Sequence, residues 1–109
     1  MGKETLGEFE HQVLLAILRL GGEAYSVNLV LELEERTGRE VAQAAVFIAL
    51  RRLEKKGLLT SRLDDRAAKE TGRVRRYFKP TRTALQRLKE TRRSLERLWE
   101  GLDVLADKA

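Results

Sequence analysis

Apolar residues in the first part of the chain recur at the three- and four-residue spacing of amphipathic helices. Thr5 and Glu8 fit a capping box at the start of the first helix, and Gly21–Gly22 marks its end. Its apolar face consists of Leu6, Phe9, Val13, Ala16, Ile17 and Leu20. A second helix is predicted to be capped by Ser26 and to end before Gly38, and its face consists of Leu29, Val30 and Leu33.

A third helix is predicted from about Ala42 to Lys56, with Gly57 as its stop. The residues that it turns inward are Val46, Ala49, Leu50 and Leu53. The three helices are too short to be stable in isolation, so we expect them to pack on one another.

After Gly57 the pattern changes from helical to extended. Leu58–Arg62 and Arg73–Phe78 have the character of strands, and the polar segment between them ends in Gly72, as a flexible hairpin tip would. Alternation divides the second strand into two faces: Arg73, Arg75, Tyr77 and Lys79 on one, and Val74, Arg76 and Phe78 on the other. We expect the aromatic residues to tether the hairpin to the core while the cations project.

A long helix is predicted from about Arg82 to Ala106, with Thr81 as its N-cap after Pro80. Its seam follows the a/d spacing of a helix that pairs with another helix: Leu85, Leu88, Arg92, Leu95, Trp99, Leu102 and Ala106. The helix either folds back on its own domain or forms a symmetric dimer, and we favour the dimer because a three-helix core cannot cover the whole seam. The predicted dimer interface is Leu88, Leu95, Trp99 and Leu102.

The predicted fold class is mainly α with a small β-hairpin. It comprises a winged helix-turn-helix domain at residues 1–80 and a C-terminal dimerisation helix at residues 81–109. The segments AVFIALRRLEKKGLLTSR and GRVRRYFKPT resemble the core motif of the PadR family of bacterial transcriptional regulators, and residues 6–38 resemble that family's first two helices. The resemblance implies a homodimer that binds operator DNA, represses transcription and is released by a small-molecule effector. The chain departs from residues common in the family at Ser26, Ala45, Phe47 and Ala84.

The start of a recognition helix faces base edges, where Gln pairs with adenine and Ala or Phe packs on a thymine methyl group. This pattern predicts some preference for A·T pairs, although Gln43 has the alternative role of capping or solvating the helix. From the hairpin, cations would reach phosphates or the minor groove, while Tyr77 would donate to a phosphate or serve in strand pairing. The predicted DNA-binding residues are Gln43, Ala44, Phe47, Arg51, Arg73, Arg75, Arg76, Tyr77 and Lys79.

The excess positive charge is confined to the hairpin region. The chain has 22 basic and 17 acidic residues, a net charge of +5. Residues 62–82 hold eight of the basic and three of the acidic ones, which leaves 14 of each elsewhere. Charge concentrated in this way favours a polyanion as partner. The alternatives are a solvated hairpin tip and a winged-helix interaction module that docks an acidic protein, which would not need a base-reading surface on the third helix.

The sequence lacks the residues of a catalytic centre. It has no Cys, and therefore no disulfide, thiolate or zinc–thiolate site; His11 is the only histidine, and no Gly-rich phosphate loop is present. We expect a protein that is not an enzyme and holds neither cofactor nor metal. The longest wholly apolar run, Val13–Leu18, is too short for a membrane helix and the N-terminus lacks an apolar signal core, so we expect a cytoplasmic protein without a membrane partner.

Trp99 suggests a site for the effector. At an a position of a symmetric dimer it would lie near its symmetry mate, and two indoles could leave a slot between flat aromatic walls. Asp103 lies four residues on and would give that slot a negative rim. Resemblance to small PadR-like proteins implies a planar, drug-like or aromatic ligand at this place, and the alternative is that Trp99 only fills the dimer core.

Overall fold

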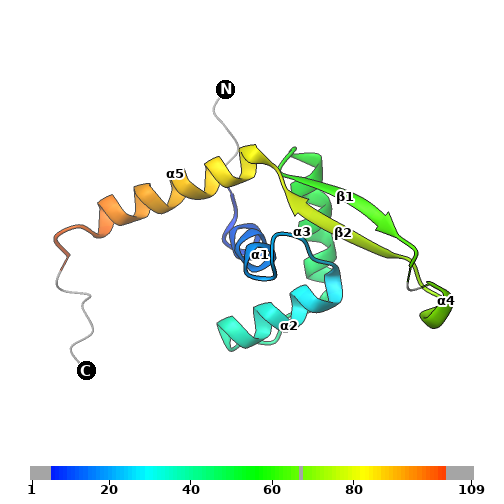
Figure 1. The fold of residues 1–109 in the computed structure, drawn as a ribbon. Coiled ribbons are helices and arrows are strands. Elements are labelled where there is room, and N and C mark those ends of the chain that lie inside the picture. Colours follow the sequence, from blue (N-terminus) through cyan, green and yellow to red (C-terminus); the bar gives the residue numbers. More distant parts are fainter. Residues whose placement is uncertain (1–5, 67, 103–109) are drawn as a thin grey trace.

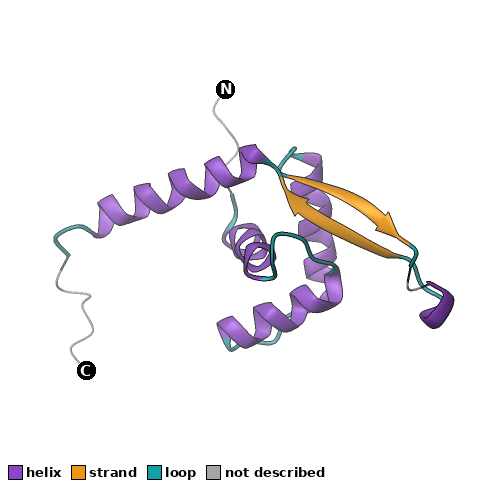
Figure 2. Cartoon of the chain, in the orientation of Figure 1, coloured by secondary structure: helices purple, strands orange, loops and turns teal. Residues whose placement is uncertain are grey.

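A bundle of three helices lies at the centre of the molecule, with a β-hairpin on one side and a long helix on the other (Figures 1 and 2). The computed structural model describes residues 6–66 and 68–102. In chain order the elements are α1 (Glu8–Arg19), α2 (Ser26–Thr37), α3 (Gln43–Lys55), β1 (Leu59–Asp64), α4 (Ala68–Thr71), β2 (Arg75–Pro80) and α5 (Arg82–Trp99). The predicted fold class, a winged helix-turn-helix followed by a long helix, is confirmed.

The first two helices are capped by residues other than those predicted. The N-cap of α1 is Gly7, whose amide donates to Glu10 Oε1 at 3.3 Å. The N-cap of α2 is Tyr25, whose amide donates to Asn28 Oδ1 at 3.0 Å. The caps predicted from Thr5 with Glu8 and from Ser26 are therefore wrong, because an acceptor on the third helical residue satisfies the N-cap amide in each case.

The third helix matches its prediction closely. α3 turns Val46, Ala49, Leu50 and Leu53 into the core, and all four are buried. It is followed by Gly57, which has a φ of 79°, and α2 is followed by Gly38 with a φ of 71°. Both glycines occupy the left-handed region that other residues enter only with strain, which explains why the helices end there.

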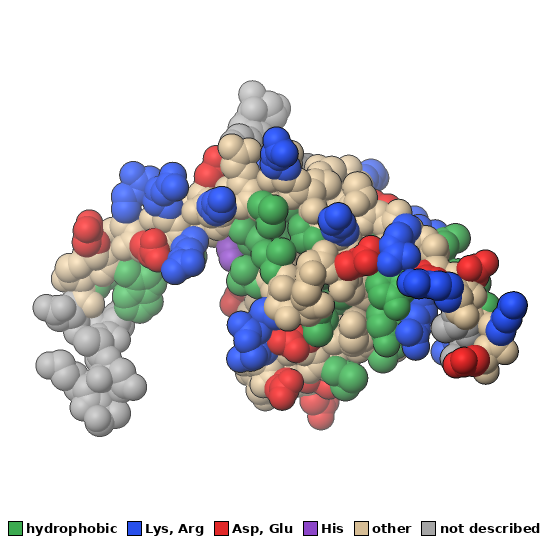
Figure 3. All heavy atoms as spheres, in the orientation of Figure 1, with side chains coloured by type: hydrophobic (Ala, Val, Ile, Leu, Met, Phe, Trp, Pro, Cys, Tyr) green, Lys and Arg blue, Asp and Glu red, His purple; other side chains and the backbone are tan. Residues whose placement is uncertain are grey.

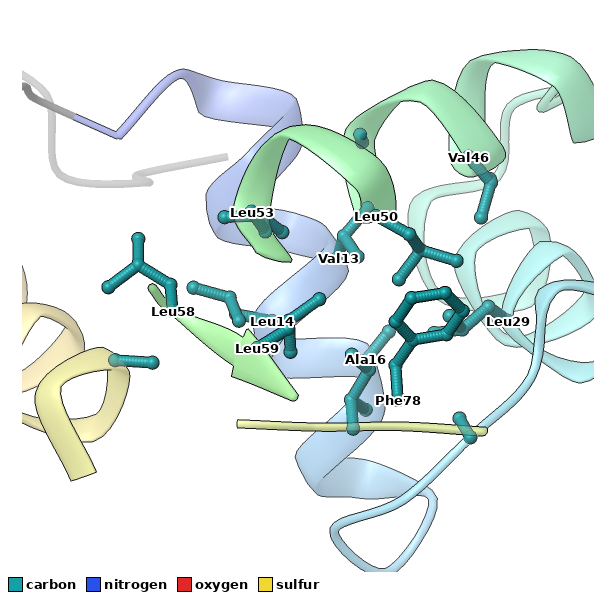
Figure 4. Packing of buried hydrophobic residues seen from close by; sticks show 14 of the residues in the cluster. Val13, Leu14, Ala16, Leu29, Val46, Leu50, Leu53, Leu58, Leu59 and Phe78 are labelled. Atoms are coloured by element: carbon teal, nitrogen blue, oxygen red, sulfur yellow. The ribbon is translucent and has the colours of Figure 1, made fainter. Parts of the chain in front are cut away.

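Phe78 anchors the hairpin to the bundle. Its side chain is 1% exposed and lies in the buried cluster beside Ala16, Leu29 and Leu50 (Figure 4). Its backbone pairs with Ala24 in the loop between α1 and α2: the Phe78 amide donates to the Ala24 carbonyl at 2.7 Å, and the reverse bond measures 3.1 Å. Side chain and backbone together fix the angle at which β2 leaves the core.

The hairpin is shifted relative to its prediction. β1 and β2 pair antiparallel, with Ser61 opposite Phe78 and Arg62 opposite Tyr77, and each begins later in the chain than the sequence pattern suggested. The tip is not a simple flexible turn, because the one-turn helix α4 occupies it. Ala68, Lys69 and Glu70 are good helix formers, and Gly72, with a φ of 73°, ends the turn.

The last helix is shorter than predicted. The Thr81 hydroxyl accepts the Ala84 amide at 3.2 Å, so the predicted N-cap is confirmed. The predicted extension to Ala106 is wrong, since α5 ends at Trp99 and Gly101 takes a φ of 77°. Leu102 therefore follows the helix instead of belonging to its seam, while Asp103 and Ala106 lie outside the described residues.

Candidate nucleic-acid interface

One face of α3 is entirely exposed. The inward residues of this helix leave the opposite face to Ala44, Ile48, Arg51 and Lys55, which follow one another at helical spacing. Ile48 is 54% exposed, although its side chain is large and apolar. The guanidinium of Arg51 lies 5.8 Å from the ring centroid of Phe47, at the edge of this face. The outer ridge of α3 thus combines apolar side chains with two cations.

A groove of about 640 Å³ separates α3 from the hairpin. Apolar side chains in it come from three elements, namely Val27 of α2, Phe47 of α3 and Val74 before β2, each about half exposed. Gln43 also lines the groove, and its Nε2 donates to Ser26 Oγ at 3.4 Å. The cations of the lining are Arg73, Arg75 and Arg76. Figure 3 shows basic side chains gathered around apolar ones at this end of the molecule.

The outer face of the hairpin carries a stack of two tyrosine rings with an arginine at each end. The Arg75 guanidinium lies 4.5 Å from the centroid of Tyr25, and Tyr25 meets Tyr77 edge-on at 5.3 Å. Arg62 lies 4.9 Å from the Tyr77 centroid and donates two hydrogen bonds of 2.8 Å to Glu23. Because Glu23 and Tyr25 belong to the loop between α1 and α2, the stack fastens both strands to that loop.

Two of the hairpin arginines, Arg62 and Arg66, form ion pairs, whereas Arg75 and Arg76 donate to hydroxyl groups. Arg62 is paired with Glu23, and Arg66 is paired with Asp64 at 2.7 Å. The hydrogen bond from Arg62 lowers the pKa of Glu23, and that from Arg66 holds the pKa of Asp64 well below its usual range. The pKa of Arg75 is raised first by its hydrogen bond to Tyr77 and then by the field of Tyr25. Arg76 donates to Ser61 Oγ at 2.9 Å, and the Ser61 hydroxyl donates in turn to Glu54 Oε2 at 2.6 Å.

The structure brings most of the predicted DNA-binding residues together. Gln43, Phe47, Arg73, Arg75 and Arg76 share the groove, while Ala44 and Arg51 lie on the outer ridge of α3. Tyr77 and Lys79 are on the hairpin face opposite Phe78, and neither lines the groove.

Sequence reasoning missed three residues of this surface: Ile48, Lys55 and Tyr25. Ile48 and Lys55 could have been found from the helical spacing, since they occupy the same face as Ala44 and Arg51. Tyr25 carried no such signal, because its position depends on contacts with the distant hairpin.

A second groove, of about 500 Å³, lies between α1 and α5. Its apolar walls are formed by Leu15, Leu18, Leu85, Leu88, Leu95 and Trp99. Leu88 is buried within the chain, whereas Leu95 is 50% and Trp99 is 54% exposed. The groove also holds His11, whose pKa is lowered by burial, and the charged side chains of Lys89, Arg92 and Glu96. Leu15 and Leu18 had not been predicted as part of this surface.

The described part of the chain contains no group of three His, Cys, Asp or Glu residues that could hold a metal ion. None of its helices is long and apolar enough to cross a membrane.

Comparison with known families and structures gives concordant results. Residues 14–90 match the model of the transcriptional regulator PadR-like family. The fold is similar to that of a PadR family transcriptional regulator from Eggerthella lenta DSM 2243, at 26% identity and a TM-score of 0.65, over 91% of this chain and 87% of that one. Comparison with curated protein sequences gives no match.

Two further solved structures share the fold at lower identity. A winged-helix DNA-binding protein from STIV is 9% identical, with a TM-score of 0.69 over 87% of this chain and 95% of that one. BpsR of Bordetella bronchiseptica, whose DNA binding is regulated by 6-hydroxynicotinic acid, is 20% identical, with a TM-score of 0.62 over 94% of this chain and 71% of that one.

Proposed function

The chain belongs to the PadR-like family of transcriptional regulators, and we propose that it binds operator DNA as a homodimer and represses transcription. The observation that carries the proposal is the exposed ridge of α3 beside a hairpin with cations in the groove between them. Family membership supports this function over the docking of an acidic protein. A helix of this width fits the major groove of B-DNA, and the cations on either side fit the phosphates.

We assign different tasks to the two elements. Ala44, Ile48 and Arg51 on α3 face base edges, with Gln43 and Phe47 at the side of the helix that faces the hairpin. Arg73, Arg75 and Arg76 contact phosphates, which supplies affinity and register but no sequence preference. Tyr77 acts indirectly, because it holds the hairpin against Tyr25 and Arg62.

The dimer forms through the α1–α5 groove in this proposal. Leu95 and Trp99 are half exposed on α5, and Leu15 and Leu18 extend the same apolar surface onto α1. Exposed apolar surface of this extent is a feature of interaction sites, and a two-fold axis would let each subunit cover the groove of the other. Leu88 supports the interface from within the subunit, while Leu102 contributes from the turn after α5.

A small effector that enters the dimer interface would release the DNA. Trp99 supplies an exposed aromatic wall in a groove that also contains Glu96, so a planar or aromatic molecule is the class of ligand that the lining favours. The predicted role of Asp103 rested on a helix continuing past Trp99. Because α5 ends at Trp99, Glu96 replaces Asp103 as the acidic group that we assign to this site.

Selection of bound fragments from a pool of random duplex DNA tests the function directly. We expect one enriched inverted repeat, with half-site centres about 10 base pairs apart or a multiple of that distance. A protein that docks acidic proteins would enrich no motif, and its addition to such a pool would leave the sequence distribution unchanged.

A further inference from the structure

The exposed face of α3 carries a large apolar side chain with no role in the core. Ile48 is 54% exposed, and the inward positions of the helix are filled by four other residues. Isoleucine is also a poorer helix former than the alanines near it, so it does not stabilise α3 locally. Folding therefore gives no reason for an isoleucine at this position.

The surroundings of Ile48 define the partner that would cover it. Ala44 precedes it by one helical turn, and Arg51 and Lys55 follow on the same face. Beyond them lie the hairpin cations Arg73 and Arg76 at the groove. A matching partner must present an apolar group at the centre and negative charge around it. In the major groove of DNA, phosphates flank the base edges, and the C5-methyl group of thymine is the apolar group that those edges carry.

We propose that Ile48, together with Ala44, recognises thymine through its C5-methyl group. This inference rests on the proposed binding of α3 in the major groove and adds the chemical group that is read. Four residues of helix rise about 6 Å, and successive bases rise about 3.4 Å. The two side chains therefore reach methyl groups about two base steps apart. Gln43 is not required for this recognition, since it lies in the groove toward the hairpin and donates to Ser26.

Recognition of a methyl group has a consequence for modified DNA. 5-Methylcytosine carries its methyl group at the same ring position as thymine, so it presents Ile48 with the same apolar surface. An operator with cytosine at the contacted position should bind weakly, and methylation of that cytosine should restore part of the affinity. The proposed ligand class is therefore a C5-methylated pyrimidine in duplex DNA.

The experiment replaces thymine by uracil, one position at a time, in the operator obtained by selection. Uracil lacks only the methyl group and retains every hydrogen-bonding group and charge. We expect one or two positions in each half-site at which the change weakens binding about three- to ten-fold, as measured by fluorescence anisotropy. At the position that Ile48 contacts, Ile48→Ala should bind the thymine and uracil duplexes equally, while a second position contacted by Ala44 should keep its thymine–uracil difference.

Arg51→Ala is the matched control, because it removes a neighbouring side chain from the same face. It should weaken binding to both duplexes while preserving the ratio between them. Ile48 is exposed, so Ile48→Ala should leave the thermal unfolding midpoint unchanged, and restoration of the thymine–uracil ratio by Ile48→Val would support the contact.

Three results would overturn the inference. Specific binding without a uracil effect at any position would exclude methyl recognition while leaving the proposed function intact. A uracil effect that persists at every position in Ile48→Ala would assign the recognition to another residue. A change in the oligomeric mass of the DNA-free protein on Ile48→Ala would show that a second copy covers this side chain. Failure to select any duplex would instead refute the proposed function, and the inference with it.

Discussion

The ridge of α3 and the α1–α5 groove both expose large apolar side chains, and to the same degree. Ile48 on the ridge and Trp99 in the groove are each 54% exposed. Their surroundings differ. The charged side chains on the face of α3 that carries Ile48 are both cations, Arg51 and Lys55. Trp99 instead lies among leucines, together with the mixed charges of Lys89, Arg92 and Glu96. The charge around each exposed residue therefore indicates which kind of partner would fit it.

If this distinction is correct, charge placed in the apolar groove should have the largest effect of all. We expect Leu95→Asp to convert a dimer at micromolar concentration into a monomer, because it forces an unpaired carboxylate into an apolar contact at a cost of several kcal/mol. Sedimentation equilibrium measures the change. Ser94→Asp is the control, since this exposed neighbour does not line the groove and introduces the same charge. A Leu95→Asp protein that remains a stable dimer would exclude this interface.

The two surfaces should respond differently to salt. If a dimer makes roughly 6–10 phosphate contacts, DNA affinity should fall about a thousand-fold or more between about 50 and 200 mM salt. Dimerisation should change little over the same range, because burial of apolar surface is not screened. Titrations of DNA binding and of the dimer dissociation constant in the same buffers test both expectations. Equal salt sensitivity of the two equilibria would contradict the assignment of one surface to DNA and the other to the partner subunit.

The sequence predicted correctly some features that depend on local contacts, and it failed for several that depend on contacts between distant segments. The inward face of α3 and the stops at Gly38 and Gly57 were predicted correctly, since helical spacing and glycine conformation are local properties. The caps of α1 and α2 were assigned to the wrong residues because the N-caps, Gly7 and Tyr25, make no side-chain cap, and the polar partner of each N-cap amide lies three residues on, at Glu10 and Asn28. The end of α5 was also missed, because the seam continues in the sequence after Gly101 interrupts the helix.

Contacts between distant segments could not be predicted. Tyr25 and Tyr77 are far apart in the chain, and nothing in their spacing indicates that they meet with Arg62 and Arg75 in one stack. The pairing of Glu23 with Arg62 has the same character, since the partners are 39 positions apart in the chain. The concentration of charge in the basic segment was visible in the sequence, while the structure was needed to show which of its cations pair with Glu23 or Asp64 and which line the groove.

That division of the cations predicts a smaller effect. Arg75→Ala should weaken DNA binding about ten-fold per half-site for every sequence, the value of one charge-assisted contact, and should reduce the salt slope by about one per half-site. Arg66→Ala removes the same charge from an arginine that is paired with Asp64, and should have little effect. Binding curves at several salt concentrations distinguish the two variants. Equal losses of DNA affinity in the two variants would mean that the hairpin attracts DNA through its overall positive charge, and that neither arginine contacts a phosphate.

The smallest expected effect is a dependence of dimerisation on pH, which arises from the protonation of His11 in the α1–α5 groove. Burial already lowers its pKa below 6.5, because the charged form loses hydration, and a second subunit over the groove would lower it further. Lys89, Arg92 and Glu96 line the same groove, so charges of both signs share it with His11.

The dimer therefore binds fewer protons than two monomers do, so dimerisation should weaken as the pH falls through the pKa of His11 and become independent of pH above about 7. If association lowers the pKa of His11 by one unit, the affinity between the two subunits at low pH should fall by at most about ten-fold for each histidine. Dimer dissociation constants at pH 5.5 and 7.5 measure the effect, and His11→Gln should make the two values equal. DNA binding by preformed dimers, in contrast, should not depend on His11, because this residue lies in the α1–α5 groove and not on the ridge of α3. An unchanged pH dependence in His11→Gln would mean that the partner subunit does not cover this part of α1.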